Sequence, residues 1–261
     1  MTRKTVDISR LLQRVIAGWL PFGSRHCVIC GHDVWWFLAH RGGSKARPAL
    51  VRELDVVGSD VDHFGCPHCG SHDRERHLLM YFEATRLLED MAGRTIVHFA
   101  PEKRLSQRIA ATRPEVYVKC DLYPVSPDVE RVDLLAMKFP SESVDLLIAN
   151  HVLEHVTDDS KALSEIHRVL KVGGYAILQT PYSRTLHRTW EDAGITSAKA
   201  RRQAFGQEDH VRLYGRDIFD RFTAPGFESH VEQHSKLLAD FDPGKFGVNA
   251  REPFFLFRRV E

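Results

Sequence analysis

Hydrophobic and polar positions follow two different periods from about residue 78 onward. Short apolar runs predict strands, and stretches in which apolar residues recur every three or four positions predict helices. Along the chain we expect a helix at 78–91, a strand at 95–100, a helix at 104–111, strands at 116–120 and 144–150, a helix at 159–170 and a strand at 175–180. Strands that alternate with helices are typical of βαβ units, so the pattern predicts an α/β fold with a mostly parallel sheet.

Two further apolar segments, 227–234 and 253–259, read as strands late in the chain. Because they lie close together in sequence, we expect them to finish the sheet as an antiparallel pair. Gly173 and Gly174 are expected to form the turn that leads into the strand at 175–180. The sequence contains neither an internal repeat nor a low-complexity tract.

The first 25 residues carry the pattern of a basic, amphipathic helix. Apolar residues recur at helical spacing between Ile8 and Trp19. Asp7 or Ser9 is expected to cap the helix, and Gly18 with the following Pro21 is expected to end it. Five Lys or Arg stand against one acid in residues 1–25. Such a helix can pack its apolar stripe on the rest of its own protein, which we favour, or make peripheral contact with an anionic membrane.

Composition narrows the class of protein. The 261 residues include 36 Lys and Arg against 35 Asp and Glu, which gives a formal net charge of +1. This balance argues against a protein that binds polyanions over its whole surface, while leaving room for local basic segments. No apolar run approaches the ~18–20 residues of a membrane span, and no signal peptide is evident. We therefore expect a cytoplasmic protein, whose cysteines serve metal binding or chemistry more often than disulfides.

Four of the five cysteines form two copies of Cys-x-x-Cys-Gly, Cys27 with Cys30 and Cys66 with Cys69. A two-residue gap lets both thiolates of a pair face one ion, and four thiolates match a closed tetrahedral zinc site that is structural. Residues 26–77 are therefore predicted to be a zinc-ribbon-like module, with the segment between the pairs folded as a hairpin or an inserted loop. The fifth cysteine, Cys120, lies in an apolar strand and is expected to be a buried, inert thiol.

Four segments after residue 95 resemble the class I S-adenosylmethionine-dependent methyltransferases, specifically their type 11 subgroup. They are 117–124, in which Asp121 follows an apolar strand; 132–140, which contains Asp133; 143–156, which contains Asn150 and His151; and 165–178, which contains the Gly173-Gly174 pair. The resemblance implies a Rossmann-like, mostly parallel seven-stranded sheet with helices on both faces. It assigns residues 78–261 to a methyltransferase domain.

The resemblance also implies which residues contact the cofactor, S-adenosylmethionine. Asp121 would hold the ribose hydroxyls, and Asp133 would accept a hydrogen bond from the adenine amino group. The full set of implied cofactor contacts is Ala100, Glu102, Asp121, Leu122, Asp133, Leu134 and Asn150. General topology agrees with this set, because ligands of open parallel sheets bind beyond the carboxyl ends of the strands.

The turn after the first strand departs from the family pattern. Ala100, Glu102 and Arg104 occupy positions where the family usually has glycine. Side chains there restrict how closely the backbone approaches a cofactor. We expect binding to be retained, with Glu102 facing the cofactor's ammonium group or serving as a carboxylate at the start of a helix. The alternative is a site in which binding is weakened or lost.

Methyl transfer to a hydroxyl requires a group that removes the proton of that hydroxyl. The catalytic candidates are His151, directly after the fourth strand, and His210, in a later polar loop. The basic segment 183–203 lies between the fifth strand and that loop. It is either a lid whose charge suits a phosphate- or carboxylate-bearing acceptor, or a solvated helix face.

The leading hypothesis is an S-adenosylmethionine-dependent O-methyltransferase of a small molecule or saccharide, with one structural zinc ion. A first alternative is an RNA methyltransferase whose zinc ribbon binds RNA. Against it stand the near-zero net charge and the sequence Asn150-His151-Val152-Leu153, which replaces the Asn/Asp-Pro-Pro-aromatic tetrad of enzymes that methylate base amino groups. A second alternative is a non-catalytic, zinc-containing scaffold with a degenerate cofactor site. The sequence indicates neither the acceptor nor the oligomeric state.

Overall fold

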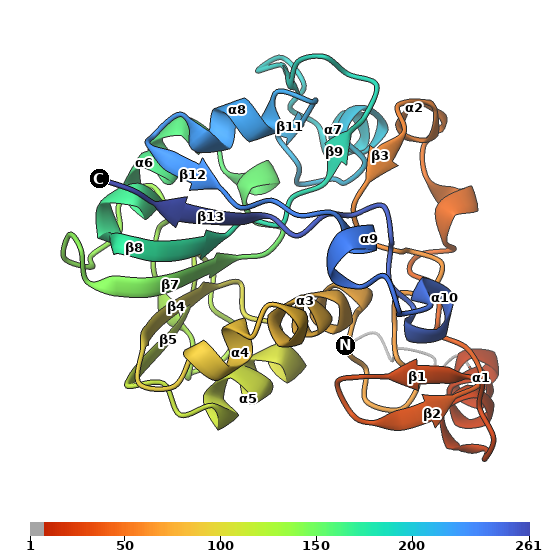
Figure 1. Ribbon diagram of the computed structural model, residues 1–261. Coiled ribbons are helices and arrows are strands. Elements are labelled where there is room, and N and C mark those ends of the chain that lie inside the picture. Colours follow the sequence, from red (N-terminus) through yellow and green to blue (C-terminus); the bar gives the residue numbers. More distant parts are fainter. Residues whose placement is uncertain (1–7) are drawn as a thin grey trace.

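A seven-stranded sheet forms the centre of the computed structural model, which describes residues 8–261 (Figure 1). Its order is β12 (Phe227–Ser229), β13 (Leu256–Arg259), β8 (Leu170–Ile177), β7 (Val144–Ala149), β4 (Thr95–Phe99), β5 (Val116–Asp121) and β6 (Glu130–Arg131). The strands from β8 to β6 run parallel, and β13 runs antiparallel to both of its neighbours, β8 and β12. The predicted α/β class, the mostly parallel sheet and the antiparallel finish are confirmed.

Helices cover both faces of the sheet. On one face lie α3 (Asp73–Ala84), α4 (Leu87–Asp90) and α5 (Lys103–Ala111), and on the other lie α6 (Asp159–Val169) and α8 (Ile218–Thr223) (Figure 1). Successive strand residues alternate between the two cores: Ile96 packs with the α3 and α5 side, whereas Val97 packs with the α6 and α8 side. The central strands are therefore apolar along their whole length because both of their faces are buried.

Two elements begin earlier than the sequence pattern predicts. The helix expected at 78–91 starts at Asp73, where His72 and Glu75 form a reciprocal capping box, and it is interrupted at Arg86, which has φ +61°. The predicted domain boundary between 77 and 78 consequently falls inside α3. The expectation of a turn at Gly173 and Gly174 is wrong, because β8 already begins at Leu170 and both glycines lie within it.

The predicted N-terminal helix is confirmed as α1 (Ile8–Trp19), but its packing differs from the interpretation that we favoured. Only its end is anchored: the Ala17 carbonyl accepts from the Trp35 amide at 2.8 Å, and the Trp19 ring lies 4.6 Å from that of His68. The apolar stripe faces solvent, with exposed fractions from 43% to 67% at Leu11, Leu12, Val15, Ile16 and Trp19. Asp7, a predicted cap, lies outside the described residues.

The segment between the two cysteine pairs is an inserted loop that reaches across to the sheet domain. The short strands β1 (Arg25–Cys27) and β2 (His32–Val34) pair next to the first cysteines, and η1 (Ser44–Ala46), α2 (Ala49–Glu53) and β3 (Val56–Val57) follow. β3 pairs antiparallel with β9 (Tyr182–Ser183), and α2 contacts α7 (Ala198–Phe205). The insertion therefore covers part of the carboxyl-end side of the sheet.

The cysteine-bearing segment is joined to the rest of the chain by one fully buried guanidinium, that of Arg76 in α3. It stacks on the Phe37 ring at 3.9 Å and donates only to backbone carbonyls. These carbonyls belong to His63, Phe64, Ser71, Phe246 and Gly247. The segments around 63–71 and 246–247 are thus held against the same side chain, which supplies donors to carbonyls of both.

The remaining elements are short and complete the periphery of the fold. They are η2 (Leu153–His155), β10 (Trp190–Glu191), β11 (Arg212–Leu213), α9 (His234–Leu237) and α10 (Pro243–Phe246). Among residues 8–261, no helix combines the length and the apolar character needed to cross a bilayer.

Candidate functional site

The four predicted zinc ligands come together in the structure. The sulfur atoms of Cys27, Cys30, Cys66 and Cys69 all lie within 4.8 Å of one another. Each pair is closed by the same turn, in which the amide after the second cysteine donates to the carbonyl of the first, at 2.8 Å for Gly31 and 2.9 Å for Gly70. Both glycines have positive φ, +71° and +78°, which explains why glycine follows each pair. The donor set and the spacing fit one tetrahedrally coordinated zinc ion.

Cys120 behaves as predicted. It is fully buried in β5, away from the four clustered cysteines, and burial raises the pKa of its thiol. A buried, neutral thiol of this kind is inert.

Five of the predicted cofactor residues lie at the carboxyl ends of β4, β5, β6 and β7 or in the loops that follow. We call this set the strand-end edge; it comprises Ala100, Glu102, Asp121, Asp133 and Asn150. The Asp121 carboxylate accepts from the Tyr123 amide at 2.7 Å, and that of Asp133 accepts from the Leu135 amide at 2.9 Å, each through Oδ1. In both cases Oδ2 has no hydrogen bond to the protein within residues 8–261, so it is available to a ligand.

Of the three positions where the family usually has glycine, only Ala100 has a positive φ; Glu102 is extended and Arg104 lies in α5. Ala100 has φ +47°, in the left-handed region that costs a residue with a Cβ about 1 kcal/mol. Glu102 is nearly buried: Asn150 Nδ2 donates to one of its carboxylate oxygens, and His98 Nε2 donates to the other at 3.1 Å. Burial raises the pKa of Glu102, but the His98 interactions outweigh it, so the pKa is lowered.

The two leucines predicted beside the cofactor differ in exposure. Leu122 is 40% exposed after Asp121, whereas Leu134 is buried in the core under α6. Leu122 is thus the one whose side chain can contact a ligand on the open side of the edge.

His151, the first catalytic candidate, occupies an unusual position directly after β7. Its φ is +54°, its side chain is 98% buried, and neither ring nitrogen has a hydrogen-bond partner among the described residues. Nδ1 lies 3.3 Å from Glu154 and Nε2 lies 3.5 Å from Glu252. Burial and the charge of Arg74 lower the pKa of His151, and the two carboxylates more than reverse this, so the pKa is raised above its usual value. Strained backbone and unpartnered buried groups of this kind cluster at functional sites.

His210, the second candidate, is brought to the same place but is already engaged. Its Nδ1 donates to the Phe205 carbonyl at 3.0 Å, and its Nε2 accepts from Gln207 at 2.7 Å. Burial lowers its pKa to about 4. His210 is therefore neutral and held in place, whereas each nitrogen of His151 faces a carboxylate without a well-aligned hydrogen bond.

Both histidines line a cavity of about 120 Å³ that lies between the inserted loop and the sheet domain. We call it the basic cavity because its ionisable lining is cationic; the lining includes Arg41, Arg47, Arg74, Arg202, His151 and His210. No Asp or Glu of the part of the chain that the structure describes is among the lining residues. The cavity meets the strand-end edge at the end of β7, where Asn150 and His151 are consecutive.

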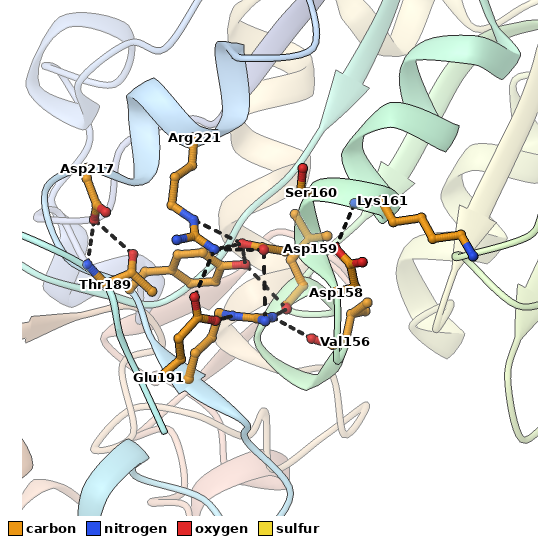
Figure 2. Close-up of polar contacts among 12 residues, drawn as sticks. Val156, Asp158, Asp159, Ser160, Lys161, Thr189, Glu191, Asp217 and Arg221 are labelled. Atoms are coloured by element: carbon orange, nitrogen blue, oxygen red, sulfur yellow. Dashed lines mark hydrogen bonds and ion pairs between the residues drawn. The ribbon is translucent and has the colours of Figure 1, made fainter. Parts of the chain in front are cut away.

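A buried ionic network fixes the loop that carries His210 (Figure 2). Asp159, at the start of α6, accepts from Arg221 at 2.7 Å and from the Tyr214 hydroxyl at 2.8 Å. Arg212 donates to Glu191 at 2.9 Å and to the carbonyls of Leu153, Val156 and Thr157. Residues 190–191, 212–214 and 221 are thereby held against η2 and α6. Arg212 and Tyr214 follow a polar loop in the sequence, yet their role here is structural.

Sequence reasoning missed Glu252, Arg47 and Arg74. Glu252 lies in the loop before β13, and the two arginines lie in the inserted loop and at the start of α3. None belongs to a motif, and each reaches the site only through tertiary structure. In the structure, Gly58 of the insertion packs against Pro181, which a Cβ on Gly58 would approach to 3.0 Å.

Comparison with known proteins bears on the middle of the chain. Residues 83–178 match the family model described as the methyltransferase domain. A stretch of 41 residues is 54% identical to the ubiquinone/menaquinone biosynthesis C-methyltransferase UbiE of Xanthomonas axonopodis pv. citri (strain 306). That stretch is 16% of this chain and 16% of the relative, so the chain matches about one sixth of that protein. The matches agree with the resemblance to methyltransferases over residues 83–178, and the bounds of the domain, 78–261, stay a prediction.

Two solved structures are similar to this chain at low sequence identity. An S-adenosylmethionine-dependent methyltransferase from Mesorhizobium loti is 18% identical, with a TM-score of 0.46 over 69% of this chain and 98% of that one. The YcgJ protein from Bacillus subtilis is 15% identical, with a TM-score of 0.43 over 69% of this chain and 99% of that one.

Proposed function

We propose that this protein transfers a methyl group from S-adenosylmethionine to a hydroxyl of a small molecule or saccharide. The observation that carries the proposal is the position of His151. This buried histidine has two unpartnered nitrogens, lies between two carboxylates, and stands where the strand-end edge meets a cavity. A base at the junction of a cofactor site and an acceptor site is what methylation of a hydroxyl requires.

The residues of the strand-end edge fit S-adenosylmethionine. The free carboxylate oxygens of Asp121 and Asp133 suit the ribose hydroxyls and the adenine amino group. Asn150 Oδ1 is buried without a hydrogen-bond partner among residues 8–261, and such an atom is explained by a ligand donor. Glu102 places negative charge beside it, which suits the ammonium group of the cofactor. When bound, S-adenosylmethionine supplies a methyl group activated by its sulfonium.

The remaining chemistry falls to this chain's own side chains. His151 accepts the proton of the acceptor hydroxyl as the oxygen forms its new bond to carbon. Glu154 and Glu252 stabilise the imidazolium that results, since each lies within 3.5 Å of a ring nitrogen. His210, with both nitrogens engaged, is a residue that positions the acceptor. Phe205, Pro181 and Leu213 give the cavity an apolar wall that keeps water from the reacting groups.

Titration calorimetry tests the cofactor site. We expect the wild type to bind S-adenosylmethionine and Asp121→Ala to bind it at least tenfold more weakly, because a carboxylate that accepts from two hydroxyls contributes about 1.5–3 kcal/mol. The matched control is Asp240→Ala, which replaces an exposed acid distant in sequence from Asp121. This variant should bind S-adenosylmethionine like the wild type. A wild type that fails to bind would instead favour the non-catalytic scaffold. Micromolar RNA affinity at physiological salt would favour the RNA methyltransferase.

We propose that the cysteine cluster holds one structural zinc ion. We also propose that the chain is divided into a zinc module at 26–77 and a methyltransferase domain at 78–261. Such a cluster needs reduced thiols, so we propose a cytoplasmic location. Elemental analysis should find one zinc per chain in the wild type. Cys66→Ser should lose the zinc and unfold the module, since structural zinc contributes about 10–16 kcal/mol in zinc-finger peptides. Cys120→Ala, outside the cluster, should keep the metal; zinc retained by Cys66→Ser would contradict the assignment.

The exposed stripe of α1 supports peripheral contact with an anionic membrane. Five large apolar side chains face solvent along the helix, and Phe22 beyond its end is 90% exposed. Residues 1–25 carry five basic side chains against one acid, which suits an anionic surface. Co-sedimentation with phosphatidylserine vesicles should fall when Leu12 and Trp19 are changed to Ser, whereas Leu122→Ser, in a loop of the sheet domain, should leave it unchanged. Equal sedimentation of all three proteins would rule out this contact.

A further inference from the structure

Two arginines of the basic cavity differ from the others in having no counter-charge in contact. Arg41 and Arg202, at the rim, both pair with Glu208, at 2.9 Å and 3.6 Å. Arg47 and Arg74 form no ion pair with any carboxylate of residues 8–261. Their hydrogen bonds go to one residue, Ser59: Arg47 Nη2 donates to its carbonyl at 3.0 Å, and Arg74 Nε donates to its hydroxyl at 2.6 Å. The two guanidinium groups therefore converge on the same spot of the cavity wall.

The acidic residues near Ser59 influence the charge of Arg47 only at distances beyond those of an ion pair. Asp60, Asp62 and Asp73 influence the charge of Arg47 without forming an ion pair with it. Each accepts a hydrogen bond from another donor, although Asp73 Oδ1 has no partner among residues 8–261. Asp60 accepts from His63, Asp62 accepts from the Ser44 amide at 2.8 Å, and Asp73 accepts from the Asp60 amide. Burial further raises the pKa of Asp73 to about 7, which weakens its negative charge at neutral pH. Two partly buried cations are thus left with unused N–H donors, an arrangement that is costly without a ligand.

The paired arginines lie next to the proposed base. Ser59 follows Gly58, and a Cβ built on Gly58 would lie 3.7 Å from His151 Cε1. Gly58 is fixed there, because its carbonyl accepts from Asn249 Nδ2 at 2.6 Å. Ser59, on which both guanidinium groups converge, is therefore adjacent in sequence to the glycine that lies beside the His151 imidazole.

We propose that the basic cavity binds a phosphate group of the methyl acceptor between Arg47 and Arg74, with the acceptor hydroxyl at His151. This inference rests on the proposed function, because it names the class of acceptor. A guanidinium presents a planar fork of donors that matches phosphate oxygens, and two of them balance a dianion. The acceptor class is then a phosphorylated small molecule or saccharide. An unphosphorylated analogue would leave both cations unpaired and be rejected.

Titration with inorganic phosphate, followed by 31P NMR, tests the inference on the full-length protein. Arg47→Met and Arg74→Met should each weaken phosphate binding by about tenfold to a hundredfold, because each removes a charge-assisted hydrogen bond. Lys45→Met, which removes an exposed charge two residues from Arg47, should bind like the wild type. If one arginine variant does not fold, as judged by circular dichroism, the other carries the test. Wild-type affinity in a folded variant, or an equal loss in Lys45→Met, would overturn the inference.

A competition arm separates the acceptor's phosphate from the carboxylate of the cofactor. Saturating S-adenosylhomocysteine should leave phosphate binding intact if the arginines serve the acceptor, and displacement of phosphate would assign them to the cofactor and overturn the inference. The same experiment keeps the two proposals apart. A wild type that binds phosphate but not S-adenosylhomocysteine would refute the proposed methyl transfer, whereas the reverse would refute only the phosphate site.

Discussion

The strand-end edge and the basic cavity meet at Asn150 and His151, yet they treat buried polar groups in opposite ways. At the edge, both oxygens of Glu102 have donors, and those donors are anchored in turn; His98 Nδ1, for example, lies 2.9 Å from the Tyr117 hydroxyl. In the cavity, His151 has two unpartnered nitrogens, and Arg47 and Arg74 have no ion pair within residues 8–261. The hydrogen bonds around Glu102 are therefore complete without a ligand, whereas those of the cavity are not.

This difference indicates which buried groups stabilise the fold and which are held in place for ligand binding. Satisfied buried groups stabilise a fold, whereas unsatisfied ones persist only where the surrounding structure holds them for another purpose. We therefore expect substitution of Glu102 to change stability, and substitutions in the cavity to change mainly activity and ligand binding. The predictions below test this separation.

The largest effect is expected for His151→Gln in the cavity. Removal of a general base lowers the rate by about a hundredfold to ten-thousandfold. Gln keeps an amide donor beside the buried carboxylates of Glu154 and Glu252, so the free energy of unfolding should fall by a smaller amount, about 1–3 kcal/mol. The rate of label transfer from methyl-tritiated S-adenosylmethionine and the midpoint of urea unfolding measure the two quantities. A stability loss as large as the activity loss would remove the distinction between the two regions.

Glu102→Ala at the edge should have the next largest effect, and on stability. The change leaves His98 Nε2 and Asn150 Nδ2 buried without an acceptor, which should cost about 3 kcal/mol. Urea unfolding measures the loss, with Glu89→Ala, an exposed acid in α4, as the control. A Glu102→Ala protein as stable as the control would show that the edge is not satisfied in the way that we describe.

A pH profile sharpens the account of the cavity. His151 must be neutral to accept a proton, so the rate should rise with pH through the His151 pKa, and the midpoint should lie above the usual value of 6.5. Glu252→Gln removes one of the carboxylates that raise this pKa and should move the midpoint to lower pH. Glu232→Gln, which removes a partly exposed carboxylate paired with Lys236, is the control. An unmoved midpoint in Glu252→Gln would mean that another group limits the rate.

The smallest effect is expected for the stability of Arg47→Met. An uncompensated, partly buried cation contributes little to folding, so the free energy of unfolding should stay within about 1 kcal/mol of the wild type or rise. Thermal unfolding without phosphate provides the measurement. A loss of several kcal/mol would show that Arg47 is a structural residue, like Arg76.

The sequence predicted the sheet and the cysteine cluster because both rest on local patterns. Strand periodicity identifies β4, β5 and β7, and the Cys-x-x-Cys-Gly turns require only neighbours in sequence. The paired guanidinium groups of Arg47 and Arg74 depend instead on the insertion crossing to β9, a tertiary contact between Val57 and Tyr182 that no periodicity encodes. Glu252 likewise reaches His151 from a loop about 100 residues away in sequence.

The helix α1 shows a different limit of sequence reasoning. Its spacing predicted the helix correctly, but an amphipathic pattern states only that one face is apolar, not what covers that face. In the structure, Ala17 and Gly18 are the buried positions, and the wide apolar stripe points outward.

The central claim is tested most directly by methyl transfer itself. Purified protein would be incubated with methyl-tritiated S-adenosylmethionine and a small-molecule extract of the cells that produce it, and the label would be followed on an anion-exchange column. The account predicts label in a retained, anionic fraction that becomes unretained after phosphatase treatment, and no label with His151→Gln. Wild-type protein that binds S-adenosylmethionine but transfers no more label than the His151→Gln variant would contradict it.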